Sequence, residues 1–428
     1  MRKIRTVVGM ILVVVMTISM MFSSQTLVKA DTSSSYLEVR GVDISSIIAF
    51  ENSGAHFYYQ NGTQGDIFDI LSDAGVNYVR VRVWNNPYDT GTGIGYGGGN
   101  NDIWKAISIG KRATNKGMKV YVDFQYSDFW ADPAKQYAPK EWQNYTNSQK
   151  ASAIYTFTFN SLKMLIDAGV DVGMVQIGNE TNGALCGMGG LYDNVWDLTT
   201  GVGEALKSGC NAVRDINNYY GYSGEQAILR VLHFTDPTTT AEWYAQQVAN
   251  VGVEYDVFSV SAYPFWFGHA SDLETTLKRV ALTYGKKVMV AETAYPYTFT
   301  NADSTNNNIG SLSDMTYCDY SVSVLGQKQA VEDIFEAIAS VNSQSGTEDC
   351  GLGGFYWEPT WIGTSTETSD AYGTGWCSSV SEYYERIYSS TNSQYSFSPQ
   401  GSSWDNMTLF DANGVALSSL QVFKEFAD

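Results

Sequence analysis

A regular alternation of short β-prone runs with longer amphipathic segments most constrains the fold of this 428-residue chain. The β-prone runs span residues 39–45, 77–83, 118–124, 172–178, 227–233, 255–262, 286–292 and 352–358. Several are almost continuously apolar, which is typical of parallel strands buried on both faces. Segments with helical periodicity alternate with them, at 64–74, 102–116, 153–168, 195–217, 241–251, 272–283, 327–341 and 417–427. Eight such units predict an α/β fold, a (β/α)8 TIM barrel, with residues 31–428 as a single domain.

Glycines and loop lengths agree with this fold. A glycine that suits a left-handed helix end precedes four of the strands, at Gly75, Gly117, Gly169 and Gly285. The connections after the seventh and eighth strands, residues 293–325 and 359–416, are much longer than the others. In a TIM barrel these loops emerge at the C-terminal ends of the strands, where active sites lie.

An open, doubly wound sheet is the alternative fold. The chain has one GxGxxG match, over residues 93–98, and it follows a predicted strand. However, no helix begins at this match, and no acidic residue stands at the expected ribose-binding position. We therefore interpret residues 93–98 as a loop.

The first 30 residues have the features of a secretory signal peptide. Arg2, Lys3 and Arg5 precede an uncharged apolar run over residues 6–22, and residues 28–30 (VKA) form a small-x-small cleavage pattern. An uncleaved membrane anchor is the alternative, because the run is near the lower length limit for spanning a bilayer. We predict cleavage after residue 30 and a secreted, extracellular protein that is not membrane-bound after cleavage.

The charge balance excludes several classes of function. Lys and Arg number 26 against 45 Asp and Glu, giving a formal net charge of −19. Nucleic acids and anionic membranes require a basic surface, so neither is an expected partner. Only 3 histidines are present, and there is no HExxH, CxxC or GxSxG motif, which argues against zinc, redox and serine-hydrolase chemistry. We expect a monomer whose chemistry depends on carboxyl groups.

Two glutamates directly follow apolar runs at the ends of predicted strands. Glu180 ends the run 176–180 (QIGNE), and Glu292 ends the run 288–292 (VMVAE). In a barrel they would lie at the C-terminal ends of the fourth and seventh strands, close enough to flank one sugar. A solvated carboxylate at the start of a loop is the alternative for either one alone. Paired carboxylates are typical of glycoside hydrolysis, so we predict that Glu180 and Glu292 are catalytic.

Seven segments resemble the endo-β-1,4-galactanases of glycoside hydrolase family 53. They are 41–46 (GVDISS), 80–87 (RVRVWNNP), 123–133 (DFQYSDFWADP), 176–181 (QIGNET), 263–266 (YPFW), 291–293 (AET) and 356–359 (YWEP). The resemblance implies an endo-acting enzyme that hydrolyses β-1,4-D-galactosidic linkages in galactan and type I arabinogalactan, side chains of plant pectin. It also implies retention of anomeric configuration, with Glu180 as general acid/base and Glu292 as nucleophile.

The predicted substrate-binding residues follow the strand ends. The polar ones are Asp43, Arg80, Arg82, Gln125, Asp128, Asn179, Asn182, His233 and Tyr263, and the aromatic ones are Trp84, Trp130, Trp266, Trp357 and Trp361. We expect Asn179 to bind a sugar 2-hydroxyl group. We expect Arg80 or Arg82, together with Tyr263, to keep Glu292 ionised. The resemblance implies that Trp357 is a platform under one sugar.

Two positions depart from the family pattern. The family has His where Gln125 stands, and another His directly after the Trp266 position, where Phe267 stands. These departures leave open a related retaining endo-β-glycanase that acts on mannan or glucan. A non-catalytic carbohydrate-binding protein is a further alternative, and the intact acid pair argues against it.

A structural calcium ion is also expected. Residues 303–307 (DSTNN) alternate oxygen-bearing side chains, a spacing that suits Ca²⁺. The resemblance to bacterial members of the family implies a calcium ion between the loops that follow the seventh and eighth strands. The implied ligands are Asp303, Thr305, Asn307, Ser402 and Asp405. We expect this ion to clamp the two loops and to take no part in the chemistry.

Overall fold

A computed structural model describes residues 36–91, 93, 95–189, 201–303, 305–363 and 402–427. The predicted signal peptide lies outside these residues, as do residues 195–200 of the predicted fourth helix and most of the long loop that follows the eighth strand. Among the helices of the described residues, none combines the length and the apolarity needed to cross a bilayer.

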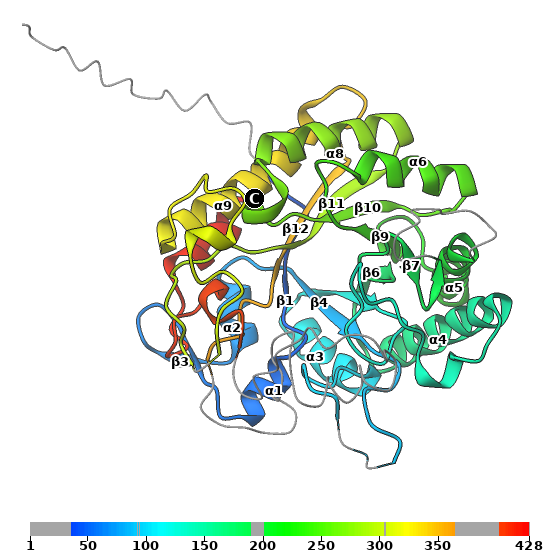
Figure 1. Cartoon of the computed structure of the whole chain (residues 1–428), viewed down its shortest axis with the longest axis horizontal. Coiled ribbons are helices and arrows are strands. Elements are labelled where there is room, and N and C mark those ends of the chain that lie inside the picture. Colours follow the sequence, from blue (N-terminus) through cyan, green and yellow to red (C-terminus); the bar gives the residue numbers. More distant parts are fainter. Residues whose placement is uncertain are drawn as a thin grey trace, which may run out of the picture. The chain divides into compact units, whose positions relative to one another are not determined.

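Eight strands form a closed barrel (Figure 1). They are β1 (Val39–Asp43), β4 (Tyr78–Val83), β5 (Lys119–Phe124), β6 (Val172–Ile177), β9 (Leu229–Phe234), β10 (Val257–Ser261), β11 (Lys287–Thr293) and β12 (Gly351–Trp357). Neighbours pair in parallel and in chain order, and β12 pairs with β1 to close the ring. The TIM-barrel prediction is confirmed, and the open-sheet alternative is wrong.

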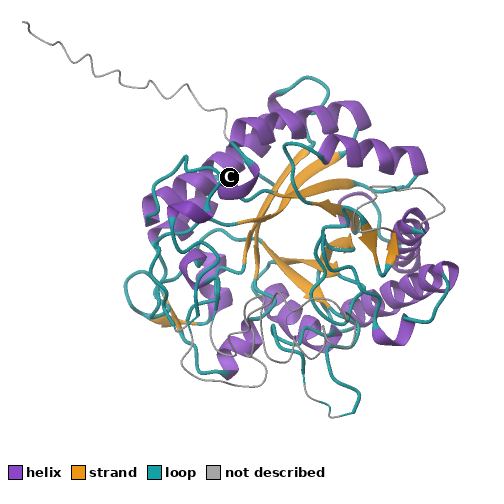
Figure 2. Cartoon of the chain, viewed as in Figure 1, coloured by secondary structure: helices purple, strands orange, loops and turns teal. Residues whose placement is uncertain are grey.

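Helices cover the outside of the strands (Figure 2). They include α2 (Ile67–Asp73), α3 (Ile103–Asn115), α4 (Asn147–Asp167), α5 (Val202–Tyr220), α6 (Ala241–Val251), α8 (Ala270–Tyr284) and α9 (Val324–Ala339). Helix α4 begins earlier than predicted because Thr146 and Gln149 form a capping box. The predicted last helix, 417–427, was too long: a 3₁₀ turn, Ser418–Gln421, precedes the short α11 (Val422–Glu425).

Several short elements were not predicted. Two are the helices α1 (Ile47–Asn52) and α7 (Pro264–Phe267). The others pair as antiparallel strands and are β2 (Phe57–Tyr58), β3 (Gln64–Gly65), β7 (Ala184–Leu185) and β8 (Met188–Gly189). All of them belong to connections between the larger elements.

Large side chains fill the barrel below its C-terminal end. Tyr78, Tyr121, Met289 and Phe355 belong to a buried cluster formed by strand residues alone. Gly41 makes room for one of them, since a Cβ atom at this position would lie 2.2 Å from the Phe355 ring. The barrel interior is therefore a packed core, and only its upper end is free to form a site.

Strand β11 contains one irregularity that positions a predicted catalytic residue. Val260 of β10 pairs with Val290, but the next residue, Ser261, pairs with Glu292. Met289 and Ala291 lie in the interior cluster, whereas Val290 packs in the outer one. Regular alternation would therefore turn Glu292 outward, toward the helices. The extra residue in β11 instead brings its side chain to the barrel interior.

Candidate active site

The C-terminal ends of the barrel strands enclose a cavity of about 330 Å³. Many of the predicted site residues line it, namely Asp43, Arg80, Arg82, Gln125, Trp130, Asn179, Glu180, Tyr263, Trp266, Glu292 and Trp357. Both predicted catalytic glutamates are therefore brought to one cavity, although they are 112 positions apart (292 − 180). A volume of this size is typical of a small-molecule or sugar site.

Five predicted residues do not belong to the cavity lining. Trp84, Trp361 and His233 are fully buried. Asp128 accepts hydrogen bonds from the backbone N–H groups of Asn86 and Lys140, and Asn182 exchanges two hydrogen bonds with the Thr235 backbone. In these positions all five support loops or neighbouring side chains, and none belongs to the cavity lining.

Other lining residues were not singled out as site residues. They are Ala131, Pro133, Thr235, Phe267 and Trp404. Trp404 belongs to the long connection after β12, and the local sequence there does not predict that its side chain reaches the cavity. Ser261, which bonds Glu180, was also missed. A signal for it existed, because Ser261 stands two positions before Tyr263 and strand side chains alternate with a period of two.

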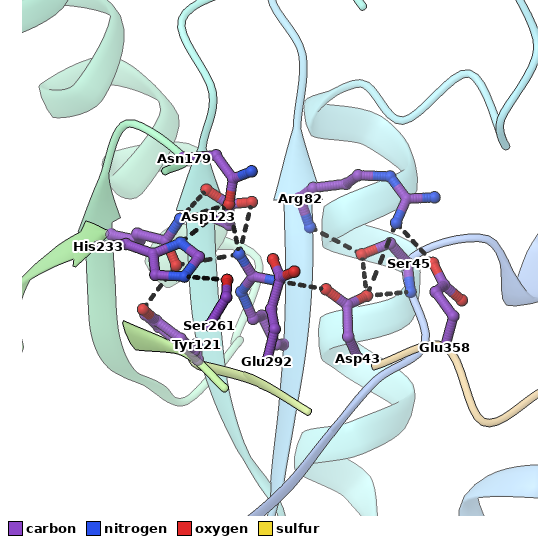
Figure 3. A network of polar contacts seen from close by, with 12 residues as sticks. Asp43, Ser45, Arg82, Tyr121, Asp123, Asn179, His233, Ser261, Glu292 and Glu358 are labelled. Atoms are coloured by element: carbon purple, nitrogen blue, oxygen red, sulfur yellow. Dashed lines mark hydrogen bonds and ion pairs between the residues drawn. The ribbon is translucent and has the colours of Figure 1, made fainter. Parts of the chain in front are cut away.

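Arg80, fully buried on β4, connects most of the polar groups in the site, and Figure 3 labels four of its partners, Asp43, Asp123, Asn179 and Glu292. Its Nη1 atom donates to Glu292 Oε1 at 2.6 Å and to Asp43 Oδ2 at 3.0 Å. Its Nη2 atom donates to Asp123 Oδ2 at 3.1 Å and to Asn179 Oδ1 at 2.9 Å. Burial alone would lower the pKa of Arg80, but the three carboxylates raise it well above its usual value. Arg80 is thus a fixed positive charge in the lining of the cavity.

Glu292 is held in a form that suits a nucleophile. Besides the bond from Arg80, its Oε2 atom accepts a hydrogen bond from the Tyr263 hydroxyl group at 3.0 Å. Burial raises the pKa of Glu292 above its usual value and the charge of Asp43 adds to this, while Arg80 and the hydrogen bond from Tyr263 oppose the shift. Because a cation and a hydroxyl donor both face this carboxylate, we assign the ionised form to Glu292.

Glu180 has a different environment. Its backbone lies in the left-handed region with φ of 45°, and strain of this kind in a non-glycine residue clusters at functional sites. Ser261 Oγ lies 2.6 Å from its Oε1 atom. Burial raises the pKa of Glu180 well above its usual value, and the negative charge of Glu292 raises it further. Two carboxyl groups in one cavity thus differ in environment as an acid and a nucleophile do.

A second buried cluster supports the site from the side of β1 and β12. Arg82 Nη1 donates to Glu358 Oε1 at 2.5 Å, and its backbone N–H donates to Ser45 Oγ. Burial raises the pKa of Glu358 to about 8, while Arg82 lowers it. The Arg82 guanidinium also lies 4.2 Å from the centre of the Trp130 ring. Arg82 therefore orients an aromatic wall of the cavity and is separated from Glu292 by Arg80 and Asp43.

Tryptophans form the other walls. Trp357 packs at right angles to Trp404, with ring centres 4.9 Å apart, and lies 6.2 Å from Trp130. Trp266 also lies close to Trp404, with ring centres 6.5 Å apart. Gln125 fixes part of this wall, since its Oε1 atom accepts from Trp84 Nε1 and from the Ala131 backbone N–H. Flat apolar faces beside polar groups are suited to binding a sugar ring.

The predicted calcium residues come together where two loops meet. Asp303 Oδ2 accepts from the Ser402 backbone N–H at 2.7 Å, and Asp405 Oδ1 accepts from Asn307 Nδ2 at 2.7 Å. The Thr305 backbone N–H donates to Asp303 Oδ1. Burial raises the pKa of Asp405 to about 6, and the charge of Asp303 contributes to this shift. Within the described parts of the chain, no group of three or more His, Cys, Asp or Glu residues could hold a metal ion.

Known proteins resemble this chain over nearly its whole length. The family model "Glycosyl hydrolase family 53" matches residues 39–423. An endo-beta-1,4-galactanase of Bacillus subtilis is 47% identical, over 90% of this chain and 85% of its own. An arabinogalactan endo-beta-1,4-galactanase of Cellvibrio japonicus is 33% identical, over 78% of this chain and 84% of its own.

Solved structures agree with the sequence comparisons. The family 53 catalytic domain from Ignisphaera aggregans superposes with a TM-score of 0.76 at 35% identity, covering 91% of this chain and 96% of that domain. The two glutamates at the barrel strand ends and these matches all indicate the same protein family. The chain belongs to glycosyl hydrolase family 53 and is a glycoside hydrolase.

Proposed function

We propose that this glycoside hydrolase is a secreted enzyme that cleaves internal β-1,4-galactosidic linkages in galactan and type I arabinogalactan, with retention of configuration. The names of the two relatives support the substrate and the internal mode of cleavage. The contrast between the two glutamates supports the retaining mechanism and is the observation that carries the proposal. The N-terminal sequence supports secretion.

The mechanism has two steps. In the first, the Glu292 carboxylate attacks the anomeric carbon while Glu180 gives its proton to the glycosidic oxygen. The C–O bond to the leaving sugar breaks, and a glycosyl ester of Glu292 forms. In the second, Glu180 takes a proton from water, whose oxygen attacks the same carbon and releases Glu292. Two inversions leave the configuration unchanged, and both protonation states return to their starting form.

Product analysis on linear β-1,4-galactan tests this function. We expect a rapid rise in reducing ends with a mixture of oligosaccharides at early times, since internal cleavage shortens the chain at many places. Proton NMR during the first minutes should show the β-anomer before mutarotation. Linear mannan and β-1,4-glucan serve as controls because Gln125 and Phe267 line the cavity at positions where the family has His. Faster release from either control would favour the related glycanase, and an initial α-anomer would exclude retention.

We also propose a structural calcium ion held by the loops after β11 and β12. Support comes from Asp303 and Asp405, whose carboxylates lie near each other, and from Asn307, whose buried Oδ1 atom has no hydrogen-bond partner among the described residues. Two carboxylates and an amide oxygen suit a hard cation. Ser402 and Asp405 flank Trp404, a cavity wall, so the ion would fix that wall relative to the loop after β11.

Removing calcium should lower the melting temperature. Ligand present at 100 times its Kd adds about 2.7 kcal/mol of stability. For a chain of this size we therefore expect EDTA to lower Tm by about 3–5 °C, with recovery on adding Ca²⁺. Magnesium, which demands a tighter octahedral site, should recover less. The variant Asp405→Asn should lose the dependence, and a Tm that is insensitive to EDTA in the wild type would argue against the site.

A further inference from the structure

A buried row of hydrogen-bonding groups leads from Glu180 through Ser261 and His233 to Asn179, and Figure 3 labels the last three. Ser261 Oγ lies 2.6 Å from Glu180 Oε1, and His233 Nε2 lies 2.9 Å from Ser261 Oγ. On the far side of the ring, His233 Nδ1 lies 3.0 Å from Asn179 Oδ1. Ser261 and His233 are both 0% exposed. Because these groups are shielded from water, one of the two groups in each contact must donate the proton of the hydrogen bond.

The far end of the row is fixed by Asn179. Its Nδ2 atom donates to the Ala131 carbonyl oxygen at 2.8 Å. Its Oδ1 atom accepts from Arg80 Nη2 at 2.9 Å and from Gln176 Nε2 at 3.1 Å. The amide cannot be turned over without losing these bonds, so Oδ1 is an acceptor. The proton between Asn179 and His233 must consequently belong to His233 Nδ1.

The positions of the protons along the row then determine the protonation state of Glu180. Burial, and the positive charge of Arg80, lower the pKa of His233 well below its usual value, so its ring carries a single proton. With that proton on Nδ1, Nε2 is an acceptor and receives the hydroxyl proton of Ser261. Ser261 Oγ is left with lone pairs facing Glu180. A contact of 2.6 Å between them is favourable only when Glu180 supplies the proton.

The reverse arrangement is poorer. If Glu180 were ionised, Ser261 would donate to it, and His233 Nε2–H would donate to Ser261. His233 Nδ1 would then be an acceptor for the Glu180 backbone N–H, at 3.4 Å. This distance exceeds the usual range for N–H donors, and the bare Nδ1 atom would face Asn179 Oδ1 at 3.0 Å, acceptor against acceptor. The row therefore favours the protonated carboxyl group.

We propose that Ser261 and His233 are positioning residues that hold Glu180 in its protonated form in the resting enzyme. This rests on the acid/base role of Glu180 in the proposed function. After Glu180 gives its proton to the leaving sugar, Ser261 can stabilise the carboxylate only by giving up its bond to His233. The ionised form is thereby disfavoured, and Glu180 recovers its proton from the attacking water.

Several charged groups also face Glu180. They are Glu292 from β11, Asp132 from the loop after β5 and Arg80 from β4; Glu292 and Asp132 raise the pKa of Glu180, and Arg80 lowers it. These charges remain when an uncharged side chain of the row is replaced. A change caused by replacing Ser261 or His233 therefore reports the row itself.

The pH dependence of kcat/KM tests the proposal, because its alkaline limb follows loss of the proton from Glu180. Ser261→Ala removes the acceptor for that proton and should shift the alkaline limb to lower pH by about one unit. His233→Ala frees the Ser261 hydroxyl to donate to the carboxylate and should move it at least as far. Ser261→Thr keeps the hydroxyl group and should return the alkaline limb to the pH at which the wild type shows it. An alkaline limb that stays in place or moves up in Ser261→Ala would overturn the proposal.

Ser259→Ala is a matched control. Ser259 is also fully buried on β10, but its hydroxyl group donates to the Leu232 carbonyl oxygen. The same substitution two residues earlier should leave the alkaline limb within a few tenths of a pH unit. If Ser259→Ala moves the limb as far as Ser261→Ala does, the shift reflects general disturbance of β10 and the proposal fails.

A spectroscopic test does not depend on turnover. The chain has 3 histidines, so nitrogen-15 labelling of imidazole gives three ring systems, and His233→Ala identifies the one that disappears. In the wild type we expect a neutral His233 with its proton on Nδ1. A proton on Nε2 alone, or on both nitrogens, would overturn the proposal. If the Nδ1–H form is found but galactan is not cleaved, the proposed function fails while the hydrogen-bond row stands.

Discussion

Replacing Glu292 with Gln is expected to lower kcat on linear galactan by at least about 10⁴-fold, because the amide cannot form the glycosyl ester. Binding of galacto-oligosaccharides should change little, since Gln has nearly the same shape as Glu. Folding should be retained, because Arg80 keeps its bonds to Asp43 and Asp123. Initial rates together with calorimetric binding check both expectations. A loss smaller than tenfold would contradict the nucleophile assignment.

Glu358→Gln is the matched control for this variant. Glu358 is also a fully buried glutamate at the end of a barrel strand, and it also accepts a hydrogen bond from an arginine, Arg82. It does not belong to the cavity lining of the described residues. We expect Glu358→Gln to keep kcat within about tenfold, because its change is confined to supporting structure. Equal losses in both variants would mean that burial of charge, and not nucleophilicity, explains the effect.

Replacing Glu180 with Ala is expected to lower kcat/KM on galactan by about 10²–10⁴-fold, the usual contribution of general acid–base catalysis. Aryl β-galactosides with acidic leaving groups should be affected much less in the first step, because their leaving group needs no proton. The alkaline limb of the pH profile should also disappear, since Glu180 no longer titrates. The acid limb, which follows protonation of Glu292, should remain.

Added azide separates the two roles. In Glu180→Ala, azide can attack the glycosyl ester in place of activated water, and the product should be the β-galactosyl azide. In Glu292→Ala, azide enters the space of the missing carboxylate and should give the α-galactosyl azide. NMR of the products distinguishes the anomers. Exchange of the two outcomes would reverse the assignment of the residues, and an absence of azide products from both would argue against a glycosyl-enzyme intermediate.

Periodicity and strand-end chemistry predicted much of this molecule. The eight apolar runs correspond to the eight barrel strands, because buried parallel strands are apolar over nearly every residue. Glu180 and Glu292 were found because each directly follows such a run. The left-handed glycines at helix ends also match, with φ of 92° at Gly75 and 85° at Gly169. All these features are determined by residues that are close together in the sequence, so they can be predicted from it.

Features set by distant contacts were harder to predict. His233 lies at a strand end, as a sugar-binding residue would, but contacts with Ser261 and Asn179 bury it completely. Trp84 and Trp361 also lie near strand ends, as Trp357 does, yet they are completely buried and do not line the cavity. Trp404 reaches the cavity from a long connection. Strand position alone does not separate a tryptophan that lines a cavity from one that supports it.

The irregularity in β11 makes the enzyme sensitive to backbone length as well as to side-chain identity. In a strand of the same sequence that paired evenly with β10, the side chain of Glu292 would turn outward, toward the helices. Glu292 would then no longer face Arg80 and Tyr263. A designer who grafts these site residues onto an idealised barrel must therefore copy the extra residue too. In a scaffold with perfectly regular strands, the same sequence would place the Glu292 side chain on the wrong face of its strand.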